Sequence, residues 1–444
     1  MSALSTVIDN IVLYKPDQVY NRVYVVSAFS GVTNVLLENK KTKAPGVYQK
    51  FANSEDYRSA LLEVADTLKE LNAQYQPLGL GVKEANAFVD AEIKQVLEYL
   101  DGATTMLASG YLNEGILLAV REILASIGES HSAYVLANIL QKKEVNARLI
   151  DLAGLHDNRA MTINERIKDA FKDVDLSTCV CIVTGYAKGK EGIMREFDRG
   201  YSEVTFSKIA EILKPDEAII HKEYHLSTAD PGLVGIDNVK PVGNTNYDIA
   251  DQLADVGMEA IHPKASKPLE MAGIHLRIKN TFEPEHPGTL ITKDYVSKLK
   301  RIEVITGTDK QLLIDIYDPL MTGNIGSDLA IMQCFADHGI SYTFKTTSAN
   351  SITIVIWEGD FKSELITDLK KRFERVTHQP VAMVCLLGTN MDQPGLLASA
   401  TTALAKADVS IIAAGMASGR VNIQFVVERS LFKPAIIALN KAIG

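Results

Sequence analysis

The segment from Cys181 to Ile212 constrains the fold more than any other part of the sequence. It starts as an apolar strand (CIVTG), continues through a loop rich in glycine and charge, and enters a helix near Tyr201. This order of elements forms anion sites in α/β proteins, because free N–H groups and the positive end of the helix dipole face the ligand. Arg199 and Glu203 flank this point. Taken alone, the pattern fits an ordinary strand-to-helix turn equally well.

A second junction of the same kind lies near the N-terminus. Residues 22–27 (RVYVVS) are predicted to form a strand that ends in a short turn, and a helix is expected to start at 32–34. Ser27 and Thr33 offer hydroxyl groups there, and Gly31 permits close approach of a phosphate or carboxylate. Capping of the helix by a hydroxyl side chain explains the same residues equally well.

Strands and helices alternate over the first two thirds of the chain, which is typical of an α/β domain with a largely parallel sheet. The polar loop HKEYHLSTADP (221–231) follows the strand at 217–220, and α/β sheets bind ligands at such strand ends. His221 and His225 lie four residues apart in this loop, where hydrogen bonding explains them better than metal binding. Further strands are predicted at 146–152, 179–184 and 275–279, and helices at 1–20, 246–258 and, with an interruption at 77–81, at 56–128.

Glu114 stands at the start of a strongly apolar helical segment that continues to Ile127. A single acid in a first helical turn usually complements the helix dipole. The alternative is a counter-charge for a substrate amine. The residues alone favour the dipole explanation.

From residue 300 onwards the sequence repeats itself in outline. Strands are predicted at 302–306, 311–317, 341–347 and 351–356 around helices at 326–338 and 360–373, followed by strands at 381–387, 409–413 and 421–427 with helices at 394–407 and 432–442. This duplication of a βαββα unit indicates paired modules, since one copy leaves a sheet face partly uncovered. The turns at 323–327 and 391–395 each precede a helix start, and small polar ligands bind at such starts. The modules therefore serve dimerisation, small-molecule sensing, or both.

Composition excludes several classes of function. The 444 residues carry a formal net charge of -9, which argues against a general nucleic-acid or anionic-membrane surface. No apolar run approaches the ~20 residues of a membrane span. Four cysteines do not make a disulfide framework in a chain of this length. We expect a cytoplasmic, reduced protein that binds neither nucleic acid nor membrane.

Several motifs in the correct order resemble the aspartate kinases. VVSAFSGVTN at 25–34 matches a strand and loop of that family, and VTGY followed by DRGYSE (198–203) is similar to its strand end and GRGGSD loop. TADP (228–231), HPK (262–264) and the closing segment RIKN…PGTLI (277–291) follow. The amino-acid sequences of the loops at 221–231 and 197–203 are similar to those of the branch of the family found with ectoine biosynthesis.

The resemblance covers nearly the whole chain and implies its architecture. An amino-acid-kinase domain of α/β class, with a largely parallel sheet flanked by helices, is expected at 1–295. Two α+β ACT modules of βαββαβ type are expected at 300–378 and 379–444, with the strand at 302–306 shared into the ACT pair. A homodimer through the ACT modules follows from their exposed sheet edges.

The resemblance also implies the reaction, which is transfer of the γ-phosphoryl group of ATP to the β-carboxylate of L-aspartate. Mg²⁺ and cationic or amide donors assist such transfers. By motif match, Arg199 pairs with an aspartate carboxylate, and Glu203 stands where the family has aspartate. The S-x-G-E spacing of the family is not kept by SGYLNE around Glu114. The implied substrate-binding residues are Ser27, Thr33, Glu114, Arg199 and Glu203, and the implied catalytic residues are Arg199, Ser202 and Glu203; no side chain is assigned to a metal.

The predicted nucleotide site departs from the family pattern. HKEYH replaces the W-T-D-x-x-G strand, Ser227 replaces a tyrosine, and Glu259 replaces the lysine of GAKVLHP, although Lys222 or Lys264 can supply a cation. The implied ATP contacts are His221, Lys222, Ser227, Asp230 and Lys264, and the effector contacts proposed for the ACT pair are Asn324, Gln393 and Asn422. The effector itself, and the choice between the lysine, threonine and methionine pathways and ectoine biosynthesis, stay open.

One family motif is missing from the sequence as given. The first strand of aspartate kinases carries a K-F-G-G-T-S loop whose lysine neutralises the transferring phosphate, whereas MSALSTVIDN resembles the helix that follows it. We expect a shortened start rather than a degenerate enzyme, and little kinase activity from this polypeptide alone. The alternative function is an amino-acid-binding ACT dimer that carries an impaired kinase domain.

Overall fold

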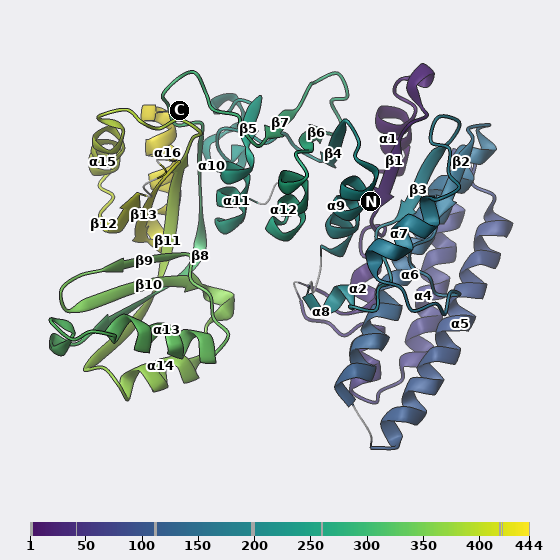
Figure 1. Ribbon diagram of the computed structural model, residues 1–444, viewed down its shortest axis with the longest axis horizontal. Helices are drawn as coiled ribbons and strands as arrows, with labels where there is room; N and C mark the ends of the chain where they lie inside the picture. The colour runs from purple at the N-terminus through teal and green to yellow at the C-terminus, as the bar shows by residue number, and fades with distance from the viewer. Residues whose placement is uncertain are drawn as a thin grey trace. The chain divides into compact units, whose positions relative to one another are not determined.

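A computed structural model describes residues 3–40, 42–110, 113–196, 200–258, 261–416, 419 and 421–443. The side chains of residues 113, 114, 196 and 443 are outside the description as well. The chain divides into two compact units (Figure 1). Unit 1 contains residues 1–216, 267–274 and 281–285, and unit 2 contains residues 217–266, 275–280 and 286–444.

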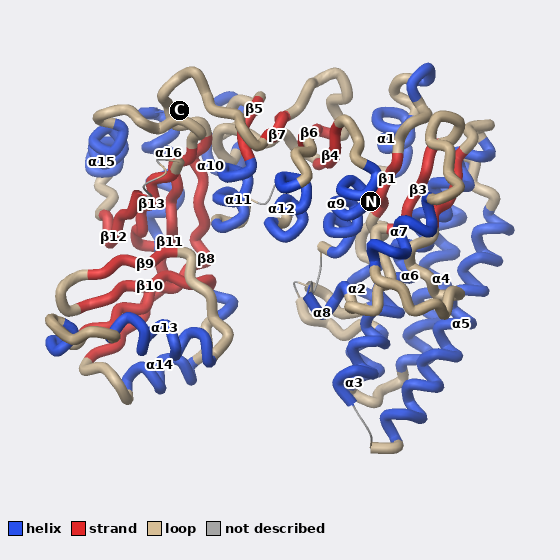
Figure 2. Tube along the Cα trace, in the orientation of Figure 1, coloured by secondary structure: helices blue, strands red, loops and turns tan. Residues whose placement is uncertain are grey.

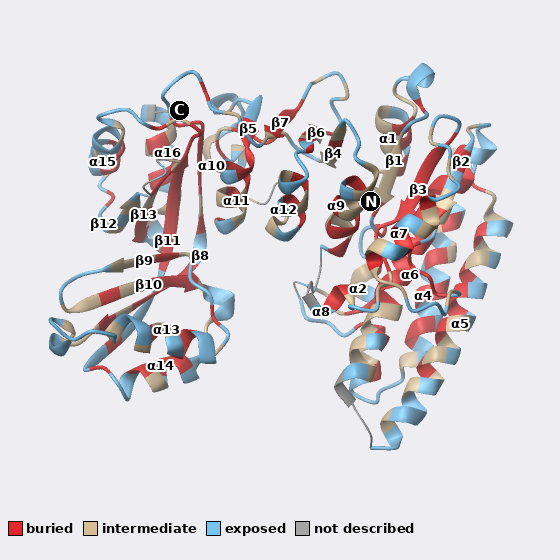
Figure 3. Cartoon of the chain, viewed as in Figure 1, coloured by how far each residue is buried: buried red, intermediate tan, exposed pale blue. Residues whose placement is uncertain are grey.

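A parallel sheet in the order β1-β3-β2 forms the centre of unit 1. Its strands are β1 (Val23–Val26), β2 (Ala147–Ile150) and β3 (Val180–Thr184), which confirms the strands predicted in these regions. All five residues of β3 are buried, as expected of a middle strand covered on both faces (Figure 3). Val26 of β1 lies opposite Thr184 of β3, so both strands end at the same edge of the sheet.

Long helices flank this sheet (Figure 2). α4 (Tyr57–Tyr75), α5 (Val82–Ala108) and α6 (Asn113–Lys142) pack in succession, and α6 lies against all three strands. No helix in the described ranges is both long and apolar enough to cross a membrane. The remaining helices of the unit are α1 (Leu4–Val7), α2 (Val32–Leu36), α3 (Val47–Ala52), α7 (Ile163–Phe171), α8 (Ile193–Glu196) and α9 (Tyr201–Leu213).

The prediction of one helix over 1–20 was wrong in detail. α1 is a single turn that continues as a π-helical turn at Ile8–Val12, and a short 3₁₀ turn follows at Pro16–Gln18. Leu4, Ile8 and Val12 are buried, so one apolar stripe is kept. Pro16 lacks a backbone N–H and cannot continue the helix, which the periodicity of the apolar residues does not reveal.

Unit 2 begins with a second, mixed sheet in the order β4-β6-β7-β5. β4 (Glu217–Lys222) pairs with β6 (His275–Asn280) in parallel, and β7 (Thr289–Thr292) is antiparallel to β6 and parallel to β5 (Asn244–Asn246). In the described residues the strands predicted for one largely parallel sheet are thus distributed over two sheets. The helices of this region are α10 (Pro231–Val234), α11 (Tyr247–Asp255) and the first turn of α12 (Pro263–Met271), whose remaining residues belong to unit 1.

The C-terminal part of unit 2 is one antiparallel sheet in the order β12-β13-β11-β8-β10-β9. Its strands are β8 (Val304–Tyr317), β9 (Phe344–Thr347), β10 (Ser351–Trp357), β11 (Arg375–Leu387), β12 (Ile411–Met416) and β13 (Asn422–Glu428). The separate strands predicted at 302–306 and 311–317 are therefore one strand, and the strand predicted at 381–387 starts six residues earlier. β8 and β11 pair along both halves, with a shift in register between Val381 and Met383.

Each repeat adds two helices to its half of this sheet. α13 (Ser327–Asp337) and α14 (Ser363–Lys370) cover one apolar cluster, and α15 (Leu396–Lys406) and α16 (Phe432–Ile443) cover another. Ile302 and Ile305 belong to the cluster beneath α15 and α16, although they lie within the first module in sequence. Residues of α11 join the opposite face of the sheet in a third cluster.

Candidate active site

The carboxyl ends of β1 and β3 place two predicted site segments side by side in unit 1. Ser27 directly follows β1 and is exposed, and Gly185 directly follows β3 and is buried. The Gly185 N–H donates to the carbonyl of Val26, which holds the two ends together. α2 follows Gly31, whose φ of 87° suits glycine, and Thr33 lies in its first turn, half-buried.

The side chain of Glu129, in α6, lies at the carboxyl ends of β1 and β3. Its side chain is 2% exposed, and its Oε1 accepts a hydrogen bond of 2.5 Å from the Ser202 hydroxyl at the start of α9. Burial raises the pKa of Glu129 to about 8, although the Ser202 hydroxyl and the Ala28 backbone N–H favour the ionised form. A carboxyl with such a pKa is largely protonated at pH 7 until a cation approaches.

Two glycines permit this close packing. A Cβ atom at Gly185 would lie 2.6 Å from Oε2 of Glu129 and 2.7 Å from the carbonyl oxygen of Val26. A Cβ atom at Gly128 would lie 2.9 Å from Cβ of Ala28. α6, β1 and β3 therefore meet at a point that larger residues cannot occupy without a shift.

Sequence reasoning missed Glu129. The assignment to Glu114 rested on a segment that does not keep the S-x-G-E spacing, and the Glu114 side chain lies outside the described residues. The segment SIGE at 126–129 keeps this spacing, so the signal was present in the sequence. Only the tertiary structure shows that Glu129 reaches Ser202.

The loop that precedes α9 holds the other predicted substrate residues. Arg199 lies outside the described residues, together with the two residues before it. Gly200 follows with a φ of 92°, and α9 then places Ser202 and Glu203 in its first turn, both half-buried. The structure thus brings Ser202 to Glu129, together with the backbone N–H of Ala28, the residue after Ser27.

The predicted nucleotide residues belong to unit 2. His221 and Lys222 end β4, half-buried, and Lys264 is exposed in the first turn of α12. The Ser227 side chain is 7% exposed, and its hydroxyl donates to the carbonyl of His225 at 3.3 Å. Asp230 caps α10, where its carboxylate accepts from the Gly232 N–H at 2.7 Å.

Metal-binding side chains do not gather in the described residues, where no three of the types His, Cys, Asp and Glu lie together. His225 instead packs against His286, with 4.1 Å between the ring centroids. The four cysteines are buried thiols.

The predicted effector residues differ in environment. Asn324 and Gln393 are exposed in the turns before α13 and α15. Asn422 is 7% exposed at the start of β13, and its side-chain amide donates to Oε1 of Gln252 in α11.

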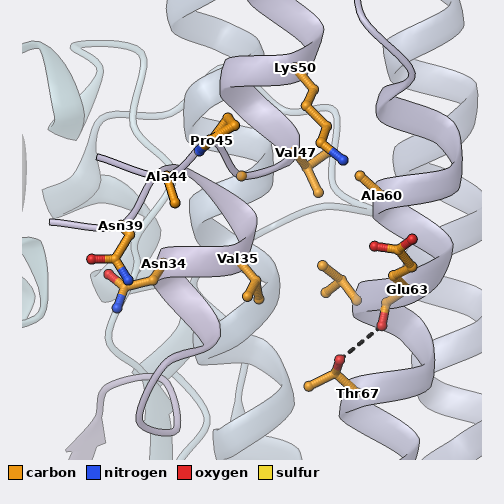
Figure 4. A pocket seen from close by; sticks show the side chains of 12 residues that line it. Asn34, Val35, Asn39, Ala44, Pro45, Val47, Lys50, Ala60, Glu63 and Thr67 are labelled. Atoms are coloured by element: carbon orange, nitrogen blue, oxygen red, sulfur yellow. Dashed lines mark hydrogen bonds between the residues drawn. The ribbon is translucent and has the colours of Figure 1, made fainter. Parts of the chain in front are cut away.

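A surface cavity of about 240 Å³ lies beside α2, between the loop at 37–46, α3 and α4 (Figure 4). Lys50 and Glu63 point toward it from α3 and α4, and Asn34 of the VVSAFSGVTN motif lines it on the α2 side. Ser27, Thr33, Glu129 and Ser202 are not part of its lining, so it is separate from the cluster around Glu129.

Comparison with known proteins identifies the family. The amino acid kinase family matches residues 2–280. Aspartate kinase Ask_Ect of Stutzerimonas stutzeri is 41% identical over 456 aligned residues, which cover 100% of this chain and 95% of that protein. The chain belongs to the aspartate kinase family. Chloroplastic aspartokinase 1 of Arabidopsis thaliana is a more distant member, 26% identical over 95% of this chain and 74% of its own length.

Solved aspartate kinases share the fold. The enzyme of Clostridium acetobutylicum matches 100% of this chain and 99% of its own with a TM-score of 0.73 at 21% identity. Aspartokinase III of E. coli, solved in complex with aspartate and ADP, matches 99% of this chain and 96% of its own with a TM-score of 0.72 at 18% identity. The predicted α/β class with ACT-type modules is confirmed by this likeness.

Proposed function

We propose that this aspartate kinase transfers the γ-phosphoryl group of ATP to the β-carboxylate of L-aspartate. The observation that carries the proposal is the buried Glu129, which reaches Ser202 where the ends of β1, β3 and the start of α9 meet. A carboxyl that is costly to ionise in a site lined by hydroxyls suits a ligand that brings its own positive charge.

Substrate aspartate supplies both kinds of charge that the site accommodates. Its ammonium group pairs with Glu129 and Glu203, and Arg199 pairs with a carboxylate. Ser27, Thr33 and Ser202 donate hydroxyl hydrogen bonds. Because burial raises the pKa of Glu129 in the free protein, aspartate binding at pH 7 releases a proton as Glu129 ionises beside the ammonium group.

ATP is assigned to the residues of unit 2. Lys222 and Lys264 supply cations for its phosphates, and His221 and Ser227 supply hydrogen bonds. Asp230, which follows Ser227 closely in sequence, fixes the start of α10. Mg²⁺ commonly binds through one or two carboxylates and the substrate phosphates. The ion neutralises charge on the phosphates; the protein contributes position and donors.

The ACT-type modules are assigned to regulation and assembly. We place amino-acid effectors at the turns that contain Asn324 and Gln393, as two separate sites, because these turns follow opposite ends of the paired strands β8 and β11. Asn422 pairs with Leu387 and is a further contact at the Gln393 end. β9 and β12 are the outer strands of the C-terminal sheet in the described residues, and such edges favour a homodimer. The product serves a cytoplasmic pathway to lysine, threonine, methionine or ectoine.

Calorimetry and product trapping test the function. The full chain is titrated with L-aspartate in two buffers of different ionisation enthalpy at pH 7, and acyl phosphate formed with ATP and Mg²⁺ is trapped with hydroxylamine. We expect saturable aspartate binding with proton release, and a small yield of hydroxamate that depends on aspartate and is absent with L-glutamate. Binding without turnover supports the non-catalytic alternative. A chain that neither binds aspartate nor forms hydroxamate refutes the proposal.

A further inference from the structure

Glu122 is a second acid on α6, half-buried and seven residues before Glu129. Seven residues make about two helical turns, so both side chains leave the helix on the same side. Oε1 of Glu122 accepts from the backbone N–H of Met194 at 2.9 Å, and Oε2 accepts from the Tyr186 hydroxyl at 3.0 Å. Each carboxylate oxygen therefore has a donor from a different segment.

These donors stand at the two ends of the segment after β3. Tyr186 follows Gly185 directly, and Met194 is the second residue of α8. Their side chains are 2% and 6% exposed. Gly192, with a φ of 74°, turns the chain beside the carboxylate, since a Cβ atom there would lie 3.2 Å from Oε1 of Glu122. One side chain thus fixes both ends of the segment 187–193.

Tyr186 extends this connection to α9. Its ring meets the ring of Tyr201 edge to face, with 5.7 Å between centroids and 78° between planes. Tyr201 is 3% exposed and is the first residue of α9, directly before Ser202. A continuous set of contacts therefore runs from Glu122 through Tyr186 to the residue beside Ser202.

We propose that Glu122 is a positioning residue for aspartate binding, which holds Tyr186 and the start of α8 and, through the ring of Tyr201, keeps Ser202 directed at Glu129. The proposal rests on the function proposed above. Glu122 itself contacts neither Glu129 nor Ser202 through any hydrogen bond of the described residues. Its action is on the positions of Tyr186, Met194 and Tyr201.

The charge of Glu122 supports this role. A carboxylate accepts a backbone N–H more strongly than a neutral acceptor does. Burial raises the pKa of Glu122, and the Met194 N–H, the Tyr186 hydroxyl and the nearby Arg195 oppose that rise, while Glu191 adds to it. Burial also raises the pKa of Tyr186 well above its ordinary value, so its hydroxyl stays a donor.

Three variants and one control test the proposal. Glu122→Ala removes both acceptors, Glu122→Gln keeps a neutral group of the same shape, and Tyr186→Phe removes one bond and keeps the ring. Glu38→Gln is the matched control, because Glu38 forms a two-pronged ion pair with Arg121, the neighbour of Glu122 on α6. The readouts are the Kd values for aspartate and for ATP by calorimetry, and hydrogen exchange of the peptide that contains Met194.

We expect the aspartate Kd to rise about tenfold or more in Glu122→Ala and about threefold in Glu122→Gln and Tyr186→Phe, as for loss of one or two hydrogen bonds to a charged group. The ATP Kd should stay within about twofold of wild type. Hydrogen exchange at Met194 should be faster than in wild type in Glu122→Gln, and faster still in Glu122→Ala. Glu38→Gln should match wild type. If Glu122→Ala loses its helical circular dichroism, the other two variants decide.

The outcomes separate this proposal from the function on which it rests. Wild-type protein that fails to bind aspartate refutes the proposed function. Wild-type protein that binds aspartate while all Glu122 and Tyr186 variants bind it equally well overturns the positioning role alone. Equal losses of aspartate and ATP affinity also overturn it, because they indicate a general loss of structure.

Discussion

Replacing Glu129 with glutamine should stabilise unit 1 in a manner that depends on pH. The pKa of Glu129 is 4.5 as an ordinary side chain and about 8 in the folded protein, because burial disfavours its charge. Between these values the folded state binds more protons than the unfolded state, so the free energy of unfolding falls as pH rises. Glutamine has the shape of the protonated carboxyl and lacks this dependence.

The magnitude follows from the interval between the two pKa values. From pH 4.5 to pH 7 the loss amounts to about 3 kcal/mol, at ~1.4 kcal/mol per pH unit. The loss of free energy of unfolding caused by Glu129 is complete above pH 8 and absent below pH 4.5. Glu129→Gln should therefore equal wild type near pH 4.5 and exceed its free energy of unfolding by about 3 kcal/mol at pH 7. The buried His131, whose pKa is lowered to about 4 by burial, also makes the free energy of unfolding depend on pH. This contribution is the same in both proteins and cancels in the difference between their free energies of unfolding.

Urea denaturation at several pH values measures this difference. Circular dichroism reports chiefly on unit 1, which contains the long helices α4, α5 and α6. Trp357, the only tryptophan in the sequence, lies in unit 2, so its fluorescence provides an internal control that should not change. Parallel curves for the two proteins between pH 5 and 8 would show that Glu129 does not carry a raised pKa, and the argument for an ammonium ligand would fail with it.

Two further substitutions test the packing. Gly185→Ala should destabilise unit 1 by about 1–3 kcal/mol and weaken aspartate binding at least tenfold, because the added Cβ atom meets the Glu129 carboxylate. The control is Gly102→Ala, which lies in open space within α5 and should stabilise the unit by about 0.5–1 kcal/mol. Similar changes in stability for both variants would contradict the packing argument. Ile305→Ala should lower the free energy of unfolding of unit 2 by about 2–5 kcal/mol by Trp357 fluorescence, since Ile305 is 1% exposed in the cluster beneath α15 and α16. Ile325→Ala, at a fully exposed position, is the control, and an equal effect would refute the assignment of Ile305 to that core.

Local patterns predicted much of this protein. Apolar runs flanked by glycine located β1, β3 and β6, and the repeat after residue 300 located the ACT-type modules. The same patterns placed a break between 306 and 311, where the structure has the continuous strand β8. Asp309 and Lys310 interrupt the apolar run there, yet pairing with β11 on both sides keeps the strand extended. Alternation within one strand carries no information about its partner strand.

The sequence by itself determined the order of the motifs, the family and the residue types available for the chemistry. It also contained the S-x-G-E spacing of Glu129, which is a local property. The tertiary structure alone decided that Glu129 is buried against Ser202, and that Glu122 joins Tyr186 to α8. The pKa of a carboxyl depends on how much water its surroundings exclude, and these surroundings come from α6, β1, β3 and α9, which are far apart in the chain and meet only after folding.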